Sequence, residues 1–246
     1  MSKIAIIGGS GLDVFSALSP IRSHQPVTPY GKPSAPVIEG RVGKQSLCFL
    51  PRHGTNHAIP PHCINYRANI AALKHLQVED VVAITAVGGI APTTPPRQIV
   101  IPDQIIDYTY DREHTFSDGL DNTVKHIDFS YPYCERLRQQ LICAAQKVGV
   151  SAETSGTYGV TQGPRLETAA EIKRMARDGC TVVGMTGMPE AALAREVQLN
   201  YANCSIVVNW AAGITNGTID LDKLEQNLKT GMEKVLALIL NWVEQR

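Results

Sequence analysis

The sequence has no excess of either charge, and this limits the partners we expect for it. Its 246 residues include 23 Lys and Arg against 23 Asp and Glu, so the formal net charge is zero. A protein dedicated to nucleic acid normally carries a basic excess or a basic stripe. The balance therefore argues against nucleic acid and leaves small molecules as the expected partners.

Long apolar runs are also missing. The run near the start covers residues 4–7, and the run at residues 235–243 is short and contains Asn241. A membrane span needs about 20 apolar residues, and a signal peptide also needs a longer apolar core. We therefore expect no contact with a membrane and a cytoplasmic location. The 43% of hydrophobic residues still suffices for a full core.

The cysteines show no CxxC pair. They are Cys48, Cys63, Cys134, Cys143, Cys180 and Cys204. Scattered thiols without the short spacing of a zinc site predict reduced, mostly buried side chains. The sequence gives no metal site.

Repeats, low-complexity tracts and long linkers are absent too, so we expect one domain over residues 1–246. Short β-branched segments alternate with segments of helical period. Strands are expected at residues 3–7, 45–50, 80–85, 157–161, 181–183 and 205–209, with an extended stretch at 98–106. Helices are expected at residues 65–76, 133–148, 166–177, 189–198 and about 222–243. This alternation predicts an α/β domain.

The turns that follow the expected strands carry the candidate site, because ligands bind at strand ends in such sheets. The first turn is Gly8-Gly9-Ser10-Gly11, whose N–H groups and hydroxyl suit an anion. A dinucleotide site would need a third glycine and a later acidic residue, and both are missing. An anion site and a plain tight turn stay open, with a dinucleotide site as the weaker alternative.

Two more turns follow the next strands. Arg52 and His53 come directly after one of them, and a guanidinium fork with an imidazole donor suits phosphate. A solvated basic turn is the alternative. The turn at residues 85–89 is made of small residues, which let a ligand approach the backbone, although a tight turn explains them as well.

The richest cluster lies in the last third of the chain. It comprises residues 163–168, residues 184–190 and Asn209 at a strand end. Glu167 and Glu190 could each do no more than favour a helix N-terminus. Asn209 could be a simple turn former.

Together and in order, these motifs resemble the trimeric purine nucleoside phosphorylase and methylthioadenosine phosphorylase family. The motifs are IIGGSGL, PRHG-x-x-H, Asn65-Tyr66-Arg67-Ala68-Asn69, TAVGG, residues 98–103, Gly163-Pro164-Arg165, GMTGMPE and Asn209. The resemblance implies a central mixed, partly rolled β-sheet flanked by helices. It also implies a homotrimer that cleaves nucleosides with inorganic phosphate as co-substrate and without a cofactor.

The family's functional positions fall on particular residues here. The phosphate positions are Ser10, Arg52, His53, Ala86 and Thr186. The nucleoside positions are Gly184, Met185, Leu166, Tyr66 and Leu221, with His126 given by a neighbouring subunit near the 5′ end of the ribose. Leu166 stands where an aromatic ring often stacks on the purine, so base binding is expected to be weaker or broader.

The base is indicated by Glu167 and Asn209. Members that prefer 6-aminopurines carry Asp at position 209 and again two residues on, whereas this chain has Asn209 and Ala211. A carboxylate accepts the N1–H of hypoxanthine, and an amide can serve O6 and N7. Adenine would present its N1 lone pair to Glu167, a mismatch of about 1–3 kcal/mol. The resemblance therefore implies a 6-oxopurine.

The sugar is indicated by a missing histidine. Ordinary 6-oxopurine members hold the ribose 5′-hydroxyl with a His near the start of the last helix, but the last His of this chain is His126. Leu221 falls at that place, and a thioether prefers such an apolar contact; a core position of the helix is the alternative. The expected substrate is 5′-methylthioinosine, with methylthioadenosine or 6-oxopurine nucleosides in general as the alternatives.

Overall fold

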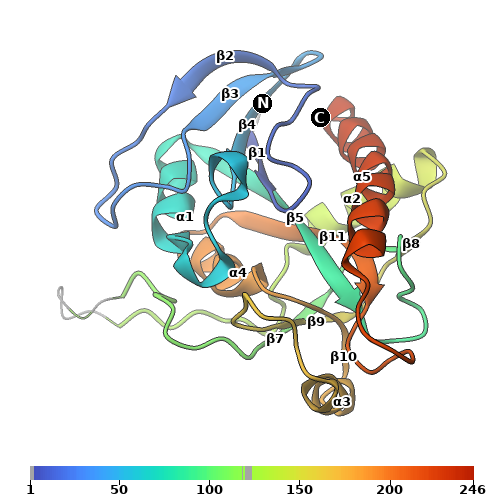
Figure 1. Ribbon diagram of the computed structural model, residues 1–246. Helices are drawn as coiled ribbons and strands as arrows, with labels where there is room; N and C mark the ends of the chain where they lie inside the picture. The colour runs from blue at the N-terminus through green and yellow to red at the C-terminus, as the bar shows by residue number, and fades with distance from the viewer. Residues whose placement is uncertain (1–2, 118, 120–123) are drawn as a thin grey trace.

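A computed structural model describes residues 3–117, 119 and 124–246. The strands are β1 Lys3–Gly8, β2 Ser19–His24, β3 Val37–Val42, β4 Gln45–Pro51, β5 Val78–Gly89, β6 Ile99–Val100, β7 Gln104–Asp107, β8 Ala152–Glu153, β9 Thr157–Val160, β10 Cys180–Gly184 and β11 Asn200–Trp210. The α-helices are α1 Tyr66–His75, α2 Glu135–Lys147, α3 Ala169–Arg177, α4 Gly187–Glu196 and α5 Leu221–Glu244. The α/β fold with a mixed central sheet is confirmed (Figure 1).

The sheet branches at β5, and this branching creates the site. β1 pairs with β5 in parallel only as far as Ala83. On the same edge, β10 joins β5 in antiparallel orientation at Gly88 and Gly89. β11 covers the other edge along residues 80–89. Among the described residues, no strand therefore pairs with β5 at residues 84–87 on the edge between β1 and β10.

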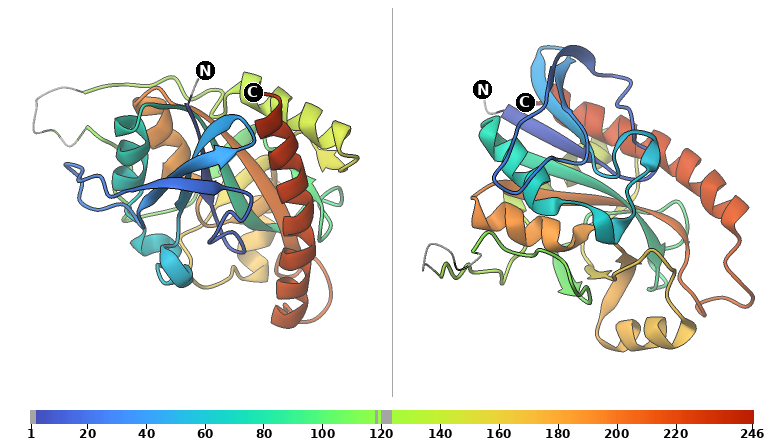
Figure 2. Two further views of the ribbon diagram at one scale, coloured as in Figure 1. Left: turned by 90° about the horizontal axis from the view of Figure 1, so that it is seen from above. Right: turned by 60° about the vertical axis from the view of Figure 1, so that its left-hand side comes forward.

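The two faces of the sheet bury different helices, because successive side chains of a strand point to opposite sides. Ile4 and Ile6 of β1 pack in the cluster with α2 and α5. Ala5 and Ile7 pack in the cluster with α1 and α4. Figure 2 shows α5 on one side of the sheet and α1 with α4 on the other. A smaller cluster joins α3 to β10.

The boundaries of two expected helices are wrong, for a local reason in each case. α3 begins at Ala169, not at residue 166, because Thr168 caps it in a capping box with Glu171. α4 begins two residues early, at Gly187, and Met188 inside it has extended backbone angles. Glu167 therefore lies ahead of a helix start and does not open the helix.

Several strands differ from the expectation as well. β5 and β11 are longer than predicted, and the expected stretch at residues 98–106 divides into β6 and β7. β2 was not predicted, since its sequence SPIRSH is almost wholly exposed and has no apolar face to reveal it. Its hydrogen bonds to β3 hold it on the sheet.

All six cysteines are free, with Cys48, Cys180 and Cys204 buried but Cys63 and Cys143 exposed, so the expected burial holds for only half of them. In the described part of the chain, no helix has the length and apolarity needed to cross a bilayer. Nor do His, Cys, Asp and Glu side chains gather there in groups that could hold a metal ion.

Candidate active site

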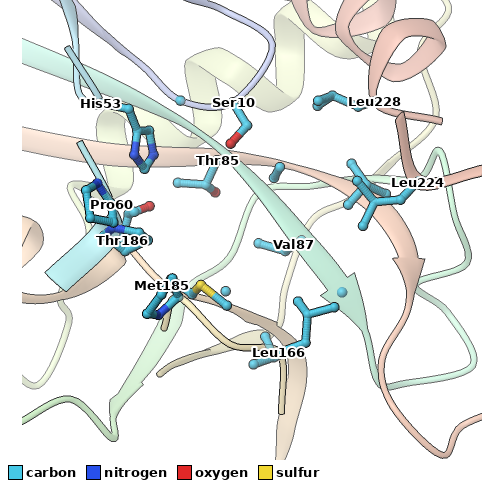
Figure 3. Close-up of a pocket in the computed structure, with 18 of the residues that line it drawn as sticks. Ser10, His53, Pro60, Thr85, Val87, Leu166, Met185, Thr186, Leu224 and Leu228 are labelled. Carbon is cyan, nitrogen blue, oxygen red and sulfur yellow. The ribbon is translucent and has the colours of Figure 1, made fainter. Parts of the chain in front are cut away.

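A cavity of about 450 Å³ lies where the edge of β5 is open. Its walls come from the turns after β1 and β4, from residues 85–88 of β5, from the ends of β10 and β11, and from α5. Each of these strand ends includes small or polar residues, such as Gly9, Ala86, Gly184 and Asn209, which leave room for the cavity. Figure 3 shows the side chains that converge on it.

Hydroxyl and imidazole groups gather at one end of the cavity. Ser10, His53, Ala86 and Thr186, which were expected to bind phosphate, all line it. The Ser10 hydroxyl lies 3.3 Å from Nε2 of His57. Figure 3 places Ser10, His53 and Thr186 around the same space. His57 was not predicted as a site residue, although it is the second His of the PRHG-x-x-H motif.

Arg52 lines the cavity, and one side of its guanidinium is taken by a carboxylate. Its Nε and Nη2 donate to the two carboxylate oxygens of Glu190, at 2.7 and 2.9 Å. Nη1 donates to the backbone oxygen of Ile84 at 3.0 Å. Nη1 and Nη2 each keep one further hydrogen for a ligand, so a bidentate contact with phosphate stays a prediction. Glu190 likewise does more than favour a helix start, since it holds Arg52.

His53 is a neutral acceptor rather than the predicted donor. Its Nδ1 lies 2.9 Å from the Ile59 oxygen, which requires Nδ1 to carry the proton. Burial and then the charge of Arg52 lower the pKa of His53 to about 4. At neutral pH, Nε2 therefore presents a lone pair. An anion that itself carries an O–H, such as hydrogen phosphate, can donate to it.

A carboxylate and an amide mark another part of the cavity. Thr161 donates from its hydroxyl to Oε1 of Glu167 at 2.6 Å, which fixes that carboxylate. Asn209 donates from Nδ2 to the Trp210 oxygen at 2.7 Å, which fixes the amide. Both residues line the cavity, together with Ala211 and the half-exposed Leu166. The structure thus brings together the residues that were expected to bind the base.

Apolar side chains form a third wall. Met185 and Gly184 line the cavity, as expected, and so do Ile219, Leu224 and Leu228. Leu221 is 66% exposed at the first position of α5 and does not line the cavity. Leu224 and Leu228 point inward one and two turns further along the helix (Figure 3). Leu224 and Leu228 follow Leu221 by three and seven residues. This helical spacing was visible in the sequence as an apolar face of the last helix.

Besides Leu221, two more expected residues do not line the cavity. Tyr66 is buried, donates its hydroxyl to the Pro61 oxygen and does not line the cavity. His126 is exposed, and its expected role lies in a neighbouring subunit, so that role stays a prediction. The pattern of the sequence also gave no sign of Arg112, whose buried guanidinium holds the loops on both sides of the site.

The branched, mixed sheet carries a pocket that brings hydroxyl groups together with a carboxylate and an amide, an arrangement suited to an α/β enzyme that acts on a small molecule. Residues 3–244 match the family described as the phosphorylase superfamily, and the chain belongs to that family. Its predicted family is thereby confirmed.

Named relatives lie within the same family. One is a probable S-methyl-5′-thioinosine phosphorylase of Xylella fastidiosa, 51% identical over 92% of this chain and 96% of the relative. Another is a 6-oxopurine nucleoside phosphorylase of Pyrococcus furiosus, 45% identical over 98% of this chain and 91% of the relative. A solved structure of Schistosoma mansoni methylthioadenosine phosphorylase with adenine superimposes with a TM-score of 0.94. It is 32% identical, and the match covers 100% of this chain and 91% of that one.

Proposed function

We propose that the enzyme cleaves 5′-methylthioinosine with inorganic phosphate, giving hypoxanthine and 5-methylthioribose 1-phosphate. The observation that carries this proposal is the fixed pair of Glu167 and Asn209 in a cavity that has a hydroxyl-lined end and an apolar wall. The name of the Xylella relative agrees with this substrate.

The pair of Glu167 and Asn209 would bind the base of the substrate. Glu167 has one oxygen engaged by Thr161, and its other oxygen can accept the N1–H of hypoxanthine. Asn209 has one N–H engaged by Trp210, so its second N–H can serve O6 and Oδ1 can accept a proton carried on N7. Ala211 puts no second carboxylate beside them. A 6-aminopurine would leave this donor and acceptor set mismatched.

Phosphate would bind at the opposite, hydroxyl-lined end. Ser10 and Thr186 can donate hydroxyls to it, and Arg52 can add the remaining hydrogens of Nη1 and Nη2. Backbone N–H groups after β1 add further donors. His53 can accept the single P–O–H of hydrogen phosphate at Nε2. The site therefore suits the dianion, which carries one proton.

The 5′-methylthio group would lie against Leu224 and Leu228. These side chains come from α5 near the hydroxyl-lined end, where Leu228 also packs against Gly11. Burial of one methyl-sized group in such a wall favours the thioether over a hydroxyl by about 1–3 kcal/mol.

The reaction would run by positioning and electrostatic stabilisation. The C1′–N9 bond breaks, its electron pair passes into the purine, and positive charge develops on the ribose. The phosphate dianion stabilises this charge and then forms the bond to C1′. The proton of hydrogen phosphate ends on the base, so the step needs no covalent enzyme intermediate and no cofactor.

The assembly and the location of the enzyme belong to the same proposal. A homotrimer would let His126 of each chain reach the 5′ end of a neighbouring site. A cytoplasmic location agrees with six free cysteines. Light scattering of the purified protein tests the trimer.

The deciding experiment measures phosphate-dependent release of base from methylthioinosine, inosine and methylthioadenosine in parallel. A strong preference for methylthioinosine supports the proposal. Equal or faster cleavage of inosine would instead make this a general 6-oxopurine phosphorylase, like the Pyrococcus relative by its name. Preference for methylthioadenosine would refute the assignment of Glu167 and Asn209. Release of base without phosphate would refute phosphorolysis.

A further inference from the structure

We infer that Arg112 is a positioning residue that sets base preference. It holds two segments in one arrangement: residues 161–162, which position Glu167 for the base, and residues 185–188, which follow β10 and include Met185 and Thr186. This inference rests on the proposed function for its substrates. Arg112 lies in the stretch after β7 and is buried, yet it does not line the cavity.

The guanidinium of Arg112 is spread over two loops. Its Nη2 donates to the backbone oxygens of Thr161 and Gln162, at 3.2 and 2.8 Å, and its Nε donates to Oε1 of Gln162 at 3.1 Å. Its Nη1 donates to the backbone oxygens of Met185 and Met188, at 2.9 and 2.6 Å. One planar group thus fixes the separation of residues 161–162 from residues 185–188.

Both loops carry site residues at the points where Arg112 holds them. Thr161 is the residue whose hydroxyl aims Glu167, so the position of its backbone decides where the carboxylate points. Met185 lines the cavity itself, and the next residue, Thr186, carries a hydroxyl for phosphate. Arg112 therefore acts on the base and on phosphate through backbone oxygens.

Arg112 also contacts Tyr66, which connects it to Pro61 in the cavity wall. Nη1 of Arg112 also lies 3.2 Å from the Tyr66 hydroxyl, which donates to Pro61, a cavity-lining residue. The guanidinium stacks on the Tyr66 ring, 5.4 Å from its centroid. Tyr66 of the family's Asn-Tyr motif therefore acts on the site through Arg112 and Pro61, and not by direct contact with the sugar.

The chemistry of these partners argues against a merely structural ion pair. The six hydrogen bonds of the guanidinium within the described residues go to carbonyl, amide and hydroxyl oxygens. Only arginine offers five N–H donors in one rigid plane, so lysine cannot reproduce the geometry even though it keeps the charge. Misplacing a reacting group by about 1 Å can lower a rate by about 10²-fold.

The test compares Arg112→Lys with Arg138→Lys. Arg138 is an equally buried arginine that donates to the backbone oxygens of Ile101, Pro102 and Thr154, none of which lines the cavity. For each protein, kcat and KM are measured with phosphate and with a 6-oxopurine and a 6-aminopurine nucleoside. Unfolding in urea reports stability alongside.

We expect Arg112→Lys to lower kcat/KM by about 10²-fold, to raise the KM for phosphate, and to bring the base-preference ratio at least about tenfold closer to one. Arg138→Lys should lower the free energy of unfolding but keep the base-preference ratio of the wild type. Thr161→Val should shift the ratio in the same direction, and its effect should not add to that of Arg112→Lys. An Arg112→Lys protein with the wild-type ratio overturns the inference.

A milder variant covers the case in which Arg112→Lys does not fold. Gln162→Leu removes the side-chain amide, whose oxygen accepts from Nε of Arg112 and from the backbone N–H of Tyr110, and leaves the backbone contacts of Arg112 in place. Its base-preference ratio must then move toward one, and an unchanged ratio overturns the inference. The base-preference ratio is measured with the nucleosides that the wild-type enzyme cleaves. The wild type alone therefore tests the proposed substrate, and the variants test the role of Arg112.

Discussion

Arg52 and Glu190 form a fully buried ion pair across the cavity wall, with Nε 2.7 Å from Oε2 and neither side chain exposed. The pair joins the turn after β4 to α4, which follows Thr186. Burial lowers the pKa of Arg52, but the Glu190 carboxylate outweighs it and leaves this pKa above its usual range. Tyr201 adds a hydroxyl donor to Oε1 of Glu190 at 2.9 Å.

Removing one partner of this pair should destabilise the protein strongly. Glu190→Ala leaves the Arg52 charge buried without a counter-ion, a loss of about 3–5 kcal/mol in the free energy of unfolding. Urea unfolding followed by circular dichroism measures it. The double variant Arg52→Met with Glu190→Met should lose less stability than the sum of the losses measured for Arg52→Met alone and Glu190→Met alone. Strictly additive losses would contradict the coupling.

Stability should depend on pH through His53. Its pKa is about 4 in the folded protein, against about 6.5 in an unfolded chain, so only the unfolded chain takes up a proton between these values. The free energy of unfolding should therefore fall by on the order of 3 kcal/mol as the pH drops from about 6.5 to 4. Above pH 6.5 this contribution is constant.

The control for this pH dependence is His53→Asn, which keeps an N–H donor for the Ile59 oxygen but does not titrate. Its stability should change less over the same pH range. Parallel curves for the variant and the wild type would show that another group is responsible.

Asn209 should matter for the transition state more than for binding. Asn209→Ala removes the amide that stabilises the departing base, and we expect kcat/KM to fall by about 10²-fold, mainly in kcat. Steady-state kinetics with saturating phosphate measure this. Near wild-type kcat would exclude Asn209 from this role.

Base preference should follow the residues at positions 209 and 211. Asn209→Asp with Ala211→Asp introduces the acceptors that suit a 6-amino group, so the ratio of kcat/KM should move toward 6-aminopurine nucleosides. Competition assays with paired nucleosides measure the ratio. An unchanged ratio in a folded, active variant would contradict the assignment of the base.

The preference for the methylthio group should depend on Leu228 and Leu224. Leu228→Ser should lower the ratio of kcat/KM for methylthioinosine over inosine by about 10-fold or more, because a hydroxyl replaces the apolar contact. The matched control is Leu221→Ser on the same helix, where the side chain is exposed. A larger effect at Leu221 would show that this residue closes over the sugar, as the resemblance implied.

The order of motifs along the chain determined the family, the α/β class and most of the site residues. Strand-end turns such as Gly8-Gly9-Ser10-Gly11 and Arg52-His53 are local signals, because glycine and polar residues after an apolar run mark a strand end wherever the strand lies. The cap at Thr168 was likewise present in the sequence as a Thr followed three residues later by a Glu.

The tertiary structure alone decided what each of these side chains does. The Nε and Nη2 side of Arg52 is taken by Glu190, 138 residues away, and the Nδ1 proton of His53 is fixed by Ile59. The branching of the sheet at β5 opens the cavity, and the turn of α5 selects Leu224 and Leu228 over Leu221. Such pairings depend on hydrogen-bond partners and burial that arise only when distant segments meet, which no local pattern of residues specifies.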